Sequence, residues 1–126
     1  MILRQPAALL ALFVAIGVAG FNKKACAVED GQLAFNNVCR TCHTVTDGDN
    51  RLGPNLHHVI GRKAGSLPDY AYSQAMKDAD LVWDKATLDR YISDPEQVVP
   101  GNKMKPYGGV GSADERAKII DYLQAN

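Results

Sequence analysis

The pattern of apolar positions along the chain predicts helices rather than strands. Apolar residues recur three or four positions apart in three segments, formed by Ala34, Phe35 and Val38, by Leu88, Tyr91 and Ile92, and by Ile119, Ile120 and Leu123. No run of alternating β-branched residues, which would indicate a strand, lies between these segments. The sequence therefore predicts an all-α domain.

Polar residues mark the expected ends of these helices. Glu29 and Asp30 place negative charge at the start of the first helix, where the helix dipole favours it. The further signals are Ser73 as N-cap of a short helix over 74–78, Asp84 as N-cap of the next helix, a stop at Asp94-Pro95, and a capping box from Ser112 to Glu115. We expect the run 98–104 to be extended and rich in turns.

Glycine and proline interrupt the chain between the first two helical segments. A polar run over 44–51 is followed by the runs 53–56 and 61–65, which contain too much Gly and Pro for regular structure. We interpret these runs as ordered loops wrapped around a large ligand.

The first 27 residues have the features of an export signal. Arg4 precedes an uncharged apolar run over 7–21, and Ala25-Cys26-Ala27 offers the small-x-small pattern of a signal peptidase site. The alternative is an uncleaved membrane anchor, but a spanning helix needs about 20 apolar residues and this run is shorter. The sequence therefore predicts a signal peptide over 1–27, one domain over 28–126, and localisation in the periplasm.

Cleavage after Ala27 would change both the charge and the cysteine content. The whole sequence balances 14 basic against 14 acidic residues, and loss of Arg4, Lys23 and Lys24 would leave 11 basic against the same 14, a formal charge of −3. This balance argues against nucleic-acid binding, which needs a clustered basic excess. Cleavage would also remove Cys26 and leave only the two cysteines at 39 and 42.

The strongest chemical signal is Cys39-Arg40-Thr41-Cys42-His43, the C-x-x-C-H pattern of covalent haem attachment. One turn of helix would bring both sulfurs to the same side of the porphyrin, and the next residue would project its ring under the iron. A thioredoxin-like redox pair would need a strand-helix context, and a disulfide would close a strained loop. A zinc site using His57 and His58 is disfavoured for two reasons: adjacent histidines are expected to point apart, and they miss the usual spacing of three to five residues between histidine ligands. The motif predicts one covalent haem c, with Cys39 and Cys42 as thioether links and His43 as an axial iron ligand.

An iron that passes electrons without binding oxygen needs a sixth ligand, and four residues are candidates. Met76 lies on a predicted helical face, where core packing is the simpler role. His57 and His58 stand near Gly-Pro in a loop. Met104 follows Pro-Gly-Asn-Lys, a rigid lead that can hold a thioether at a fixed depth. Met104 is therefore the expected second axial ligand.

Taken together, these motifs resemble the class I cytochromes c, of the small mitochondrial and bacterial cytochrome c₂ kind. The resemblance runs from about Gly31 to Leu123 and rests on the order and spacing of 39–43, 53–56, 61–65, 70–73, Trp83, Tyr91 and 100–104. It implies a cytochrome c fold of three to five helices wrapped around one covalent haem. The first and last helices would cross at the matching residues Gly31, Phe35, Tyr122 and Leu123.

The same resemblance implies roles for residues around the haem. The backbone carbonyl of Pro54 would accept the Nδ1 proton of His43 and so orient its ring. Tyr91 would lie near the sulfur of Met104. Because a charge in a low-dielectric shell must be paired, the haem propionates would be bound by three donors, namely Arg62, Tyr72 and Trp83.

The chain also departs from the family pattern. His58 replaces a glycine, and Met76 replaces an asparagine. After Met104 the segment is one residue longer than usual, and Tyr107 replaces a phenylalanine. The loop between His43 and Pro54 is one residue shorter than in the mitochondrial pattern. Relatives that meet acidic partners often carry lysines where this chain has Glu96 and Gln97. These differences bear on the reduction potential and on docking, not on the ligands.

The expected function is one-electron transport rather than catalysis. Candidate partners are a cytochrome bc-type complex, a terminal oxidase of a respiratory chain, a photosynthetic reaction centre or a periplasmic dehydrogenase, met by a monomer that docks only transiently at a membrane surface. One alternative is a haem peroxidase or gas sensor with an open sixth position. Another is the cytochrome subunit of a dehydrogenase, because one fold can serve several functions.

Overall fold

The protein is built from helices joined by long loops. The computed structural model describes residues 23–126, in which five helices follow in the order α1 (Lys23–Val38), α2 (Gln74–Asp78), α3 (Lys85–Ser93), α4 (Pro95–Val98) and α5 (Ala113–Gln124). These residues include no β-strand, only an isolated antiparallel bridge between Lys63 and Val82. The predicted all-α fold with three to five helices is confirmed.

Helix α1 begins earlier than the sequence suggested. Its first residue is Lys23, whereas the acidic pair Glu29-Asp30 predicted a start near that pair. Residues 23–28 include two lysines and two alanines, which are favourable in a helix, so the helix extends back through them. The expected cleavage point after Ala27 falls within this extension, and the apolar run 7–21 lies outside the described residues. From residue 23 onward, none of the helices is long and apolar enough to cross a membrane.

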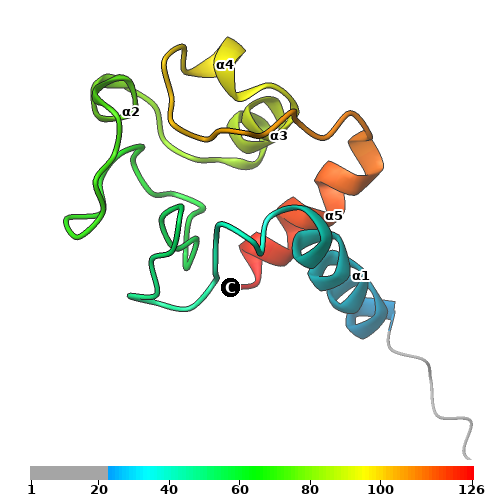
Figure 1. The fold of residues 1–126 in the computed structure, drawn as a ribbon. Coiled ribbons are helices and arrows are strands. Elements are labelled where there is room, and N and C mark those ends of the chain that lie inside the picture. Colours follow the sequence, from blue (N-terminus) through cyan, green and yellow to red (C-terminus); the bar gives the residue numbers. More distant parts are fainter. Residues whose placement is uncertain (1–22) are drawn as a thin grey trace, which may run out of the picture.

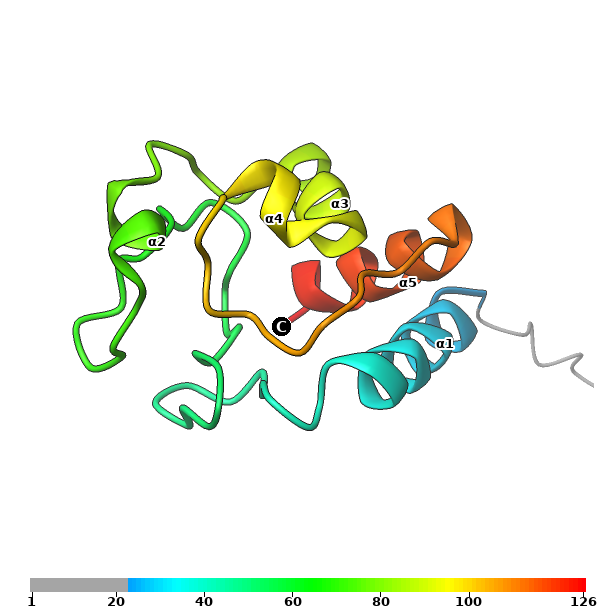
Figure 2. The ribbon, with the colours of Figure 1, turned by 45° about the horizontal axis from the view of Figure 1, so that its top comes forward.

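Helices α1 and α5 cross at a glycine. Figures 1 and 2 show the two helices side by side, with α3 packed against α5. A Cβ atom on the buried Gly31 would lie 2.6 Å from the carbonyl oxygen of Lys118 and 2.9 Å from Cβ of Tyr122. The ring of Phe35 packs beside this contact, with its centroid 5.3 Å from that of Tyr122. The predicted crossing of the first and last helices is therefore confirmed.

Replacing Gly31 with Ala should push these two helices apart. Alanine favours a helix by about 1 kcal/mol over glycine, but overpacking of this kind costs roughly 1–3 kcal/mol. Because the new methyl would meet a backbone carbonyl that cannot move alone, the cost should exceed the gain, and we expect a net loss of up to about 2 kcal/mol in the free energy of unfolding. Denaturant unfolding of the haem-loaded protein measures this change in the free energy of unfolding. Gly108→Ala is the control, since a Cβ there meets no atom within 4 Å, and equal stability of the two variants would contradict the expectation.

Side chains cap the N-terminus of every helix after α1. Each cap accepts a hydrogen bond from the backbone N–H three residues further on, and the caps are Ser73 on α2, Asp84 on α3, Asp94 on α4 and Ser112 on α5. The caps of α2, α3 and α5 were predicted, and the cap of α4 was not. The sequence predicted a stop at Asp94-Pro95, but this dipeptide ends α3 and also begins α4, because proline is favourable at a first helical position. The expected extended run begins only after Val98.

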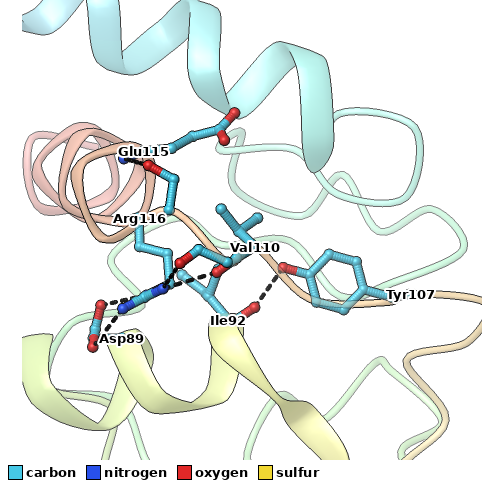
Figure 3. Close-up of polar contacts among 8 residues, drawn as sticks. Asp89, Ile92, Tyr107, Val110, Glu115 and Arg116 are labelled. Carbon is cyan, nitrogen blue, oxygen red and sulfur yellow. Dashed lines mark hydrogen bonds and ion pairs between the residues drawn. The ribbon is translucent and has the colours of Figure 1, made fainter.

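The loop between α4 and α5 is anchored to α3 and α5 at its far end (Figure 3). The Tyr107 hydroxyl donates a hydrogen bond of 2.8 Å to the Ile92 carbonyl, which also accepts the Val110 N–H at 3.0 Å. On α5, the guanidinium of Arg116 donates to the Val110 carbonyl at 2.9 Å and, through Nε, to the carboxylate of Asp89 at 2.7 Å. The end of this loop is thereby fixed against two helices.

The stretch between α1 and α2, residues 39–73, contains no helix and is held by backbone hydrogen bonds to a distant segment. The Gly61 N–H donates to the Trp83 carbonyl at 2.7 Å, and the Trp83 N–H donates to the Arg62 carbonyl at 2.9 Å. A third bond, 3.0 Å long, joins the Ala64 N–H to the Leu81 carbonyl. These bonds bring Arg62 and Trp83, which are far apart in the sequence, next to each other.

Candidate functional site

The C-x-x-C-H motif lies in a hydrogen-bonded turn directly after α1. The Cys39 N–H still bonds to the Phe35 carbonyl at 2.8 Å, and the N–H groups of Cys42 and His43 both bond to the Cys39 carbonyl, at 3.1 and 2.9 Å. The sequence predicted one turn of helix here, but α1 ends at Val38 and the motif forms a turn that follows it. This turn sets the cysteines and the imidazole at the end of a rigid helix.

The thiol of Cys39 lies in surroundings that disfavour its reactive thiolate form. Cys39 and Cys42 are both free thiols, and Cys39 is buried. Burial, with smaller contributions from Cys42 and Glu115, raises the pKa of the Cys39 thiol to about 12. Redox-active and metal-binding cysteines instead have lowered pKa values and react as thiolates. The environment of Cys39 therefore suits a sulfur that is held in a permanent bond.

The imidazole of His43 is held by one backbone oxygen. Its Nδ1 donates to the Pro54 carbonyl at 2.8 Å, so Nε2 is left unprotonated, with a lone pair for a metal. The side chain is buried, and this burial lowers the pKa of His43 despite the bond to Pro54, while the charge of Arg62 lowers it further. A neutral imidazole is the form that binds a metal.

Gly53 allows this imidazole to lie against the backbone. A Cβ at Gly53 would overlap His43 Cε1 and would lie 2.6 Å from Nδ1 and 2.8 Å from Nε2. The Gly53 N–H also donates to the Cys42 carbonyl at 2.8 Å, which ties the loop to the motif. The sequence pattern included Gly53 in a loop motif without giving it this role. Its position directly before Pro54, whose carbonyl was expected to bind His43, was the signal in the sequence from which this role could have been predicted.

Arg62 holds a positive charge that has no acidic partner among the described residues. Its guanidinium is half-buried and donates only to backbone carbonyls, to that of Asn55 at 2.8 Å and to that of His57 at 3.2 Å. Burial lowers the pKa of Arg62 and raises the pKa of the nearby Tyr72 hydroxyl, a rise that the Arg62 charge partly offsets. A partly buried guanidinium of this kind favours an anionic ligand.

Trp83 and Tyr91 add two further donors. Their ring centroids lie 4.9 Å apart, and both side chains are buried. Burial, with a smaller contribution from Glu96, raises the pKa of Tyr91 well above its ordinary value, so the hydroxyl keeps its proton. Within residues 23–126, neither the Tyr91 hydroxyl nor the Trp83 indole N–H forms a hydrogen bond. Together with Arg62 and Tyr72, this donor set fits a bound group that carries carboxylates, as haem does.

The two methionines named as ligand candidates have different surroundings. Met76 is 8% exposed, lies on α2 and belongs to the hydrophobic core. Met104 is only partly buried and lies in the loop after Pro100, where Gly101 has a φ of +83°. Its N–H donates to Asn102 Oδ1 at 2.9 Å. Met104 thus has a fixed backbone and a partly buried side chain that packs against the edge of the core rather than within it.

The two adjacent histidines lie together, contrary to the sequence interpretation. The ring centroids of His57 and His58 are 3.9 Å apart, whereas adjacent side chains were expected to point apart. His58 has a φ of +47°, a left-handed conformation that favours glycine, the residue that the family resemblance implies at this position. The turn at His58 brings the two rings to one side. No group of three or more metal-ligating side chains occurs in the described part of the chain.

Asn55 has a buried side-chain oxygen without a partner. The residue is 2% exposed, and its Oδ1 is the one buried side-chain N or O atom among the described residues that forms no hydrogen bond. Its Nδ2 and its backbone N–H both donate to Asn50 Oδ1, at 3.0 and 2.9 Å, which fixes the amide orientation. This oxygen can only accept a hydrogen bond, so an N–H or O–H donor would satisfy it whereas an ionised carboxylate would not.

Comparison with known proteins gives consistent results at the level of sequence. The family described as "Cytochrome C oxidase, cbb3-type, subunit III" matches residues 26–123. Cytochrome c type-1 of Ascaris suum is 41% identical over 96 residues, which cover 76% of this chain and 85% of that protein. Cytochrome c2 of Rhodopila globiformis is 41% identical over 95 residues, covering 75% of this chain and 89% of that protein.

A solved structure resembles this fold closely. Cytochrome cH from Methylobacterium extorquens superposes with a TM-score of 0.72 and is 37% identical in sequence. The similarity covers 79% of this chain and 98% of that one. The fold of this chain therefore has a counterpart that the similarity covers almost completely.

Proposed function

The chain belongs to the class I cytochrome c family and carries electrons on one covalently bound haem c, and we propose that it does so in the periplasm, between membrane-bound or soluble redox proteins. Its relatives are electron carriers, and the chain is a carrier rather than an enzyme. Haem c supplies an iron that accepts and gives up a single electron. The side chains around the haem would attach it, bind its iron and hold its propionates.

In this proposal the chain itself saturates the iron. Cys39 and Cys42 would hold the porphyrin by thioether links, while His43 and Met104 would occupy the two axial positions. With both positions filled by the protein, an electron can arrive or leave without any exchange of ligands, and no site is left for oxygen. A thioether opposite an imidazole also raises the reduction potential relative to harder ligand pairs.

The donors around the site would hold the propionates and orient the ligands. We assign the propionates to Arg62, Tyr72 and Trp83, and we place Tyr91 beside the sulfur of Met104. The single observation that carries the proposal is the hydrogen bond from Nδ1 of His43, the last residue of the attachment motif, to the Pro54 carbonyl. It leaves a buried, neutral imidazole with one free nitrogen next to two thiols.

The proposed location rests on the N-terminal sequence. We propose that residues 1–27 are a signal peptide and that residues 28–126 form the mature domain. The test is expression of the full chain in a bacterium with c-type haem maturation, followed by fractionation and mass spectrometry. We expect a periplasmic protein with the mass of residues 28–126 plus haem, which isolated membranes oxidise after reduction. A full-length chain retained in the membrane fraction would contradict the location, and failure of membranes to oxidise the protein would contradict the role.

Docking should depend on a basic residue beside Met104. Lys103 is exposed and forms no ion pair with any residue from 23 to 126, whereas Lys105 Nζ lies 3.3 Å from Glu96 Oε2. The expected mature charge is negative, and exposed charges more than about 8–10 Å apart are screened at physiological salt. Attraction would therefore be local, and we expect the rate of electron transfer to fall far less with salt than the 10–10³-fold of strongly steered pairs.

Lys103→Glu should slow electron transfer to membranes more than Lys118→Glu does. Both lysines are exposed and both changes alter the charge equally, but Lys118 lies on α5, where its backbone carbonyl faces Gly31 of α1. Stopped-flow rates across a salt series measure the effect. Equal rates for the two variants would show that the docking surface lies elsewhere.

A further inference from the structure

The carboxylate of Glu96 reaches from α4 into the loop that carries Met104. Its Oε1 accepts the Gly101 N–H at 2.9 Å, and its Oε2 accepts Asn102 Nδ2 at 3.1 Å. The ammonium of Lys105 lies 3.3 Å from Oε2. One side chain therefore holds the loop at three points, before and after Met104.

The side chain of Asn102 links Glu96 to the backbone of Met104 by hydrogen bonds. The side chain is 4% exposed, and its Nδ2 also donates to the Val99 carbonyl at 3.0 Å. Its Oδ1 accepts the Met104 N–H at 2.9 Å. An amide side chain has two N–H donors and one carbonyl oxygen. In Asn102 the two donors serve Glu96 and the Val99 carbonyl, and the oxygen serves Met104.

The two ends of the loop are held differently. The far end is fixed to α3 and α5 through Tyr107, Val110 and Arg116, as Figure 3 shows. In the described structure, the side chains that bond the segment 101–105 are those of Glu96 and Asn102. Loss of Glu96 would therefore loosen the near end of the loop while the far end stays attached.

We propose that Glu96 is a positioning residue for the distal ligand, acting through Asn102 on the backbone of Met104. This inference rests on the proposed assignment of Met104 as that ligand. The consequence is kinetic: the loop opens rarely, and Met104 is seldom displaced.

The test is the rate at which imidazole added to the ferric protein displaces Met104. At saturating imidazole this rate is limited by loop opening. The displacement is monitored by the loss of the sulfur-to-iron charge-transfer band. We expect Glu96→Ala to raise the rate about tenfold or more, the factor that corresponds to roughly 1.4 kcal/mol. Gln97→Ala is the matched control on α4, because none of the described contacts involves its side chain, and it should leave the rate unchanged.

Two further variants separate positioning from general stability. Glu96→Gln keeps the shape and weakens the acceptor, so it should raise the rate less than Glu96→Ala and in the same direction. If Glu96 acts through Asn102, adding Glu96→Ala to Asn102→Ala should change the rate little beyond Asn102→Ala alone. A residue with only a structural role would lower the free energy of unfolding without speeding displacement.

The outcomes distinguish this inference from the ligand assignment itself. Rates for Glu96→Ala equal to those for Gln97→Ala, with the band present in the parent protein and absent in Met104→Ala, would overturn the role of Glu96 alone. A charge-transfer band that survives in Met104→Ala would overturn the assignment of the ligand. Full additivity in the double variant would overturn the route through Asn102.

Discussion

The variant with Cys39→Ser and Cys42→Ser is expected to be largely unfolded when it is exported. Without the thioether links the chain would lose the group around which its loops are arranged. Residues 39–73 contain no helix, and loops longer than about 12–15 residues are uncommon unless something organises them. A domain of this size has little core to spare, so the hydrogen bonds to Pro54, Trp83 and Arg62 are not expected to hold the stretch alone.

Circular dichroism and limited proteolysis measure this effect. We expect loss of most helical signal and digestion at least about tenfold faster than for the haem-loaded protein, as for a chain whose open form is populated tenfold more. Thr41→Ser is the control, because Thr41 is exposed and this change leaves both cysteines of the motif in place. A cooperative thermal transition in the double variant would contradict the expectation.

Met104→Ala is expected to remove the distal ligand while leaving the fold intact. The ferric protein should lose its sulfur-to-iron charge-transfer band, and the ferrous protein should bind carbon monoxide. The reduction potential should fall by on the order of a few hundred millivolts, a substantial part of the roughly 0.8 V range that axial ligands span. Met104 is only partly buried, so its truncation should cost less stability than a core truncation.

Met76→Ala is the matched control for this result. Met76 is 8% exposed in the core, so truncation should cost about 2–5 kcal/mol of unfolding free energy. The band and the failure to bind carbon monoxide should nevertheless persist. Loss of the band in Met76→Ala, with its retention in Met104→Ala, would exchange the roles of the two residues.

Local signals in the sequence were enough to predict most of the helices. The caps Ser73, Asp84 and Ser112 act within one turn of their own helix, so the residues that form each contact are close in sequence. The crossing at Gly31 came from the family resemblance, because its partners on α5 are nearly ninety positions away. α4 was missed because Pro95 was interpreted only as a stop.

The part of the site that lies in one short motif could be predicted from the sequence. The part that depends on contacts between distant segments could not. The residue types of 39–43 predict covalent haem without any structure. The contacts of Glu96 could not be predicted, because they depend on how α4 turns the chain back towards Gly101 and Asn102. The packing of His57 against His58 was likewise not predictable, because it follows from the positive φ of His58.

The central claim is that the protein fills both axial positions of an iron that only carries electrons, and one measurement tests it directly. The reduction potential of the purified haem-loaded protein is titrated under argon and again under carbon monoxide. A ligand that binds only the reduced form raises the potential by linkage. We predict one reversible one-electron transition with the same midpoint under both gases, whereas a higher midpoint under carbon monoxide would show an open sixth position and contradict the account.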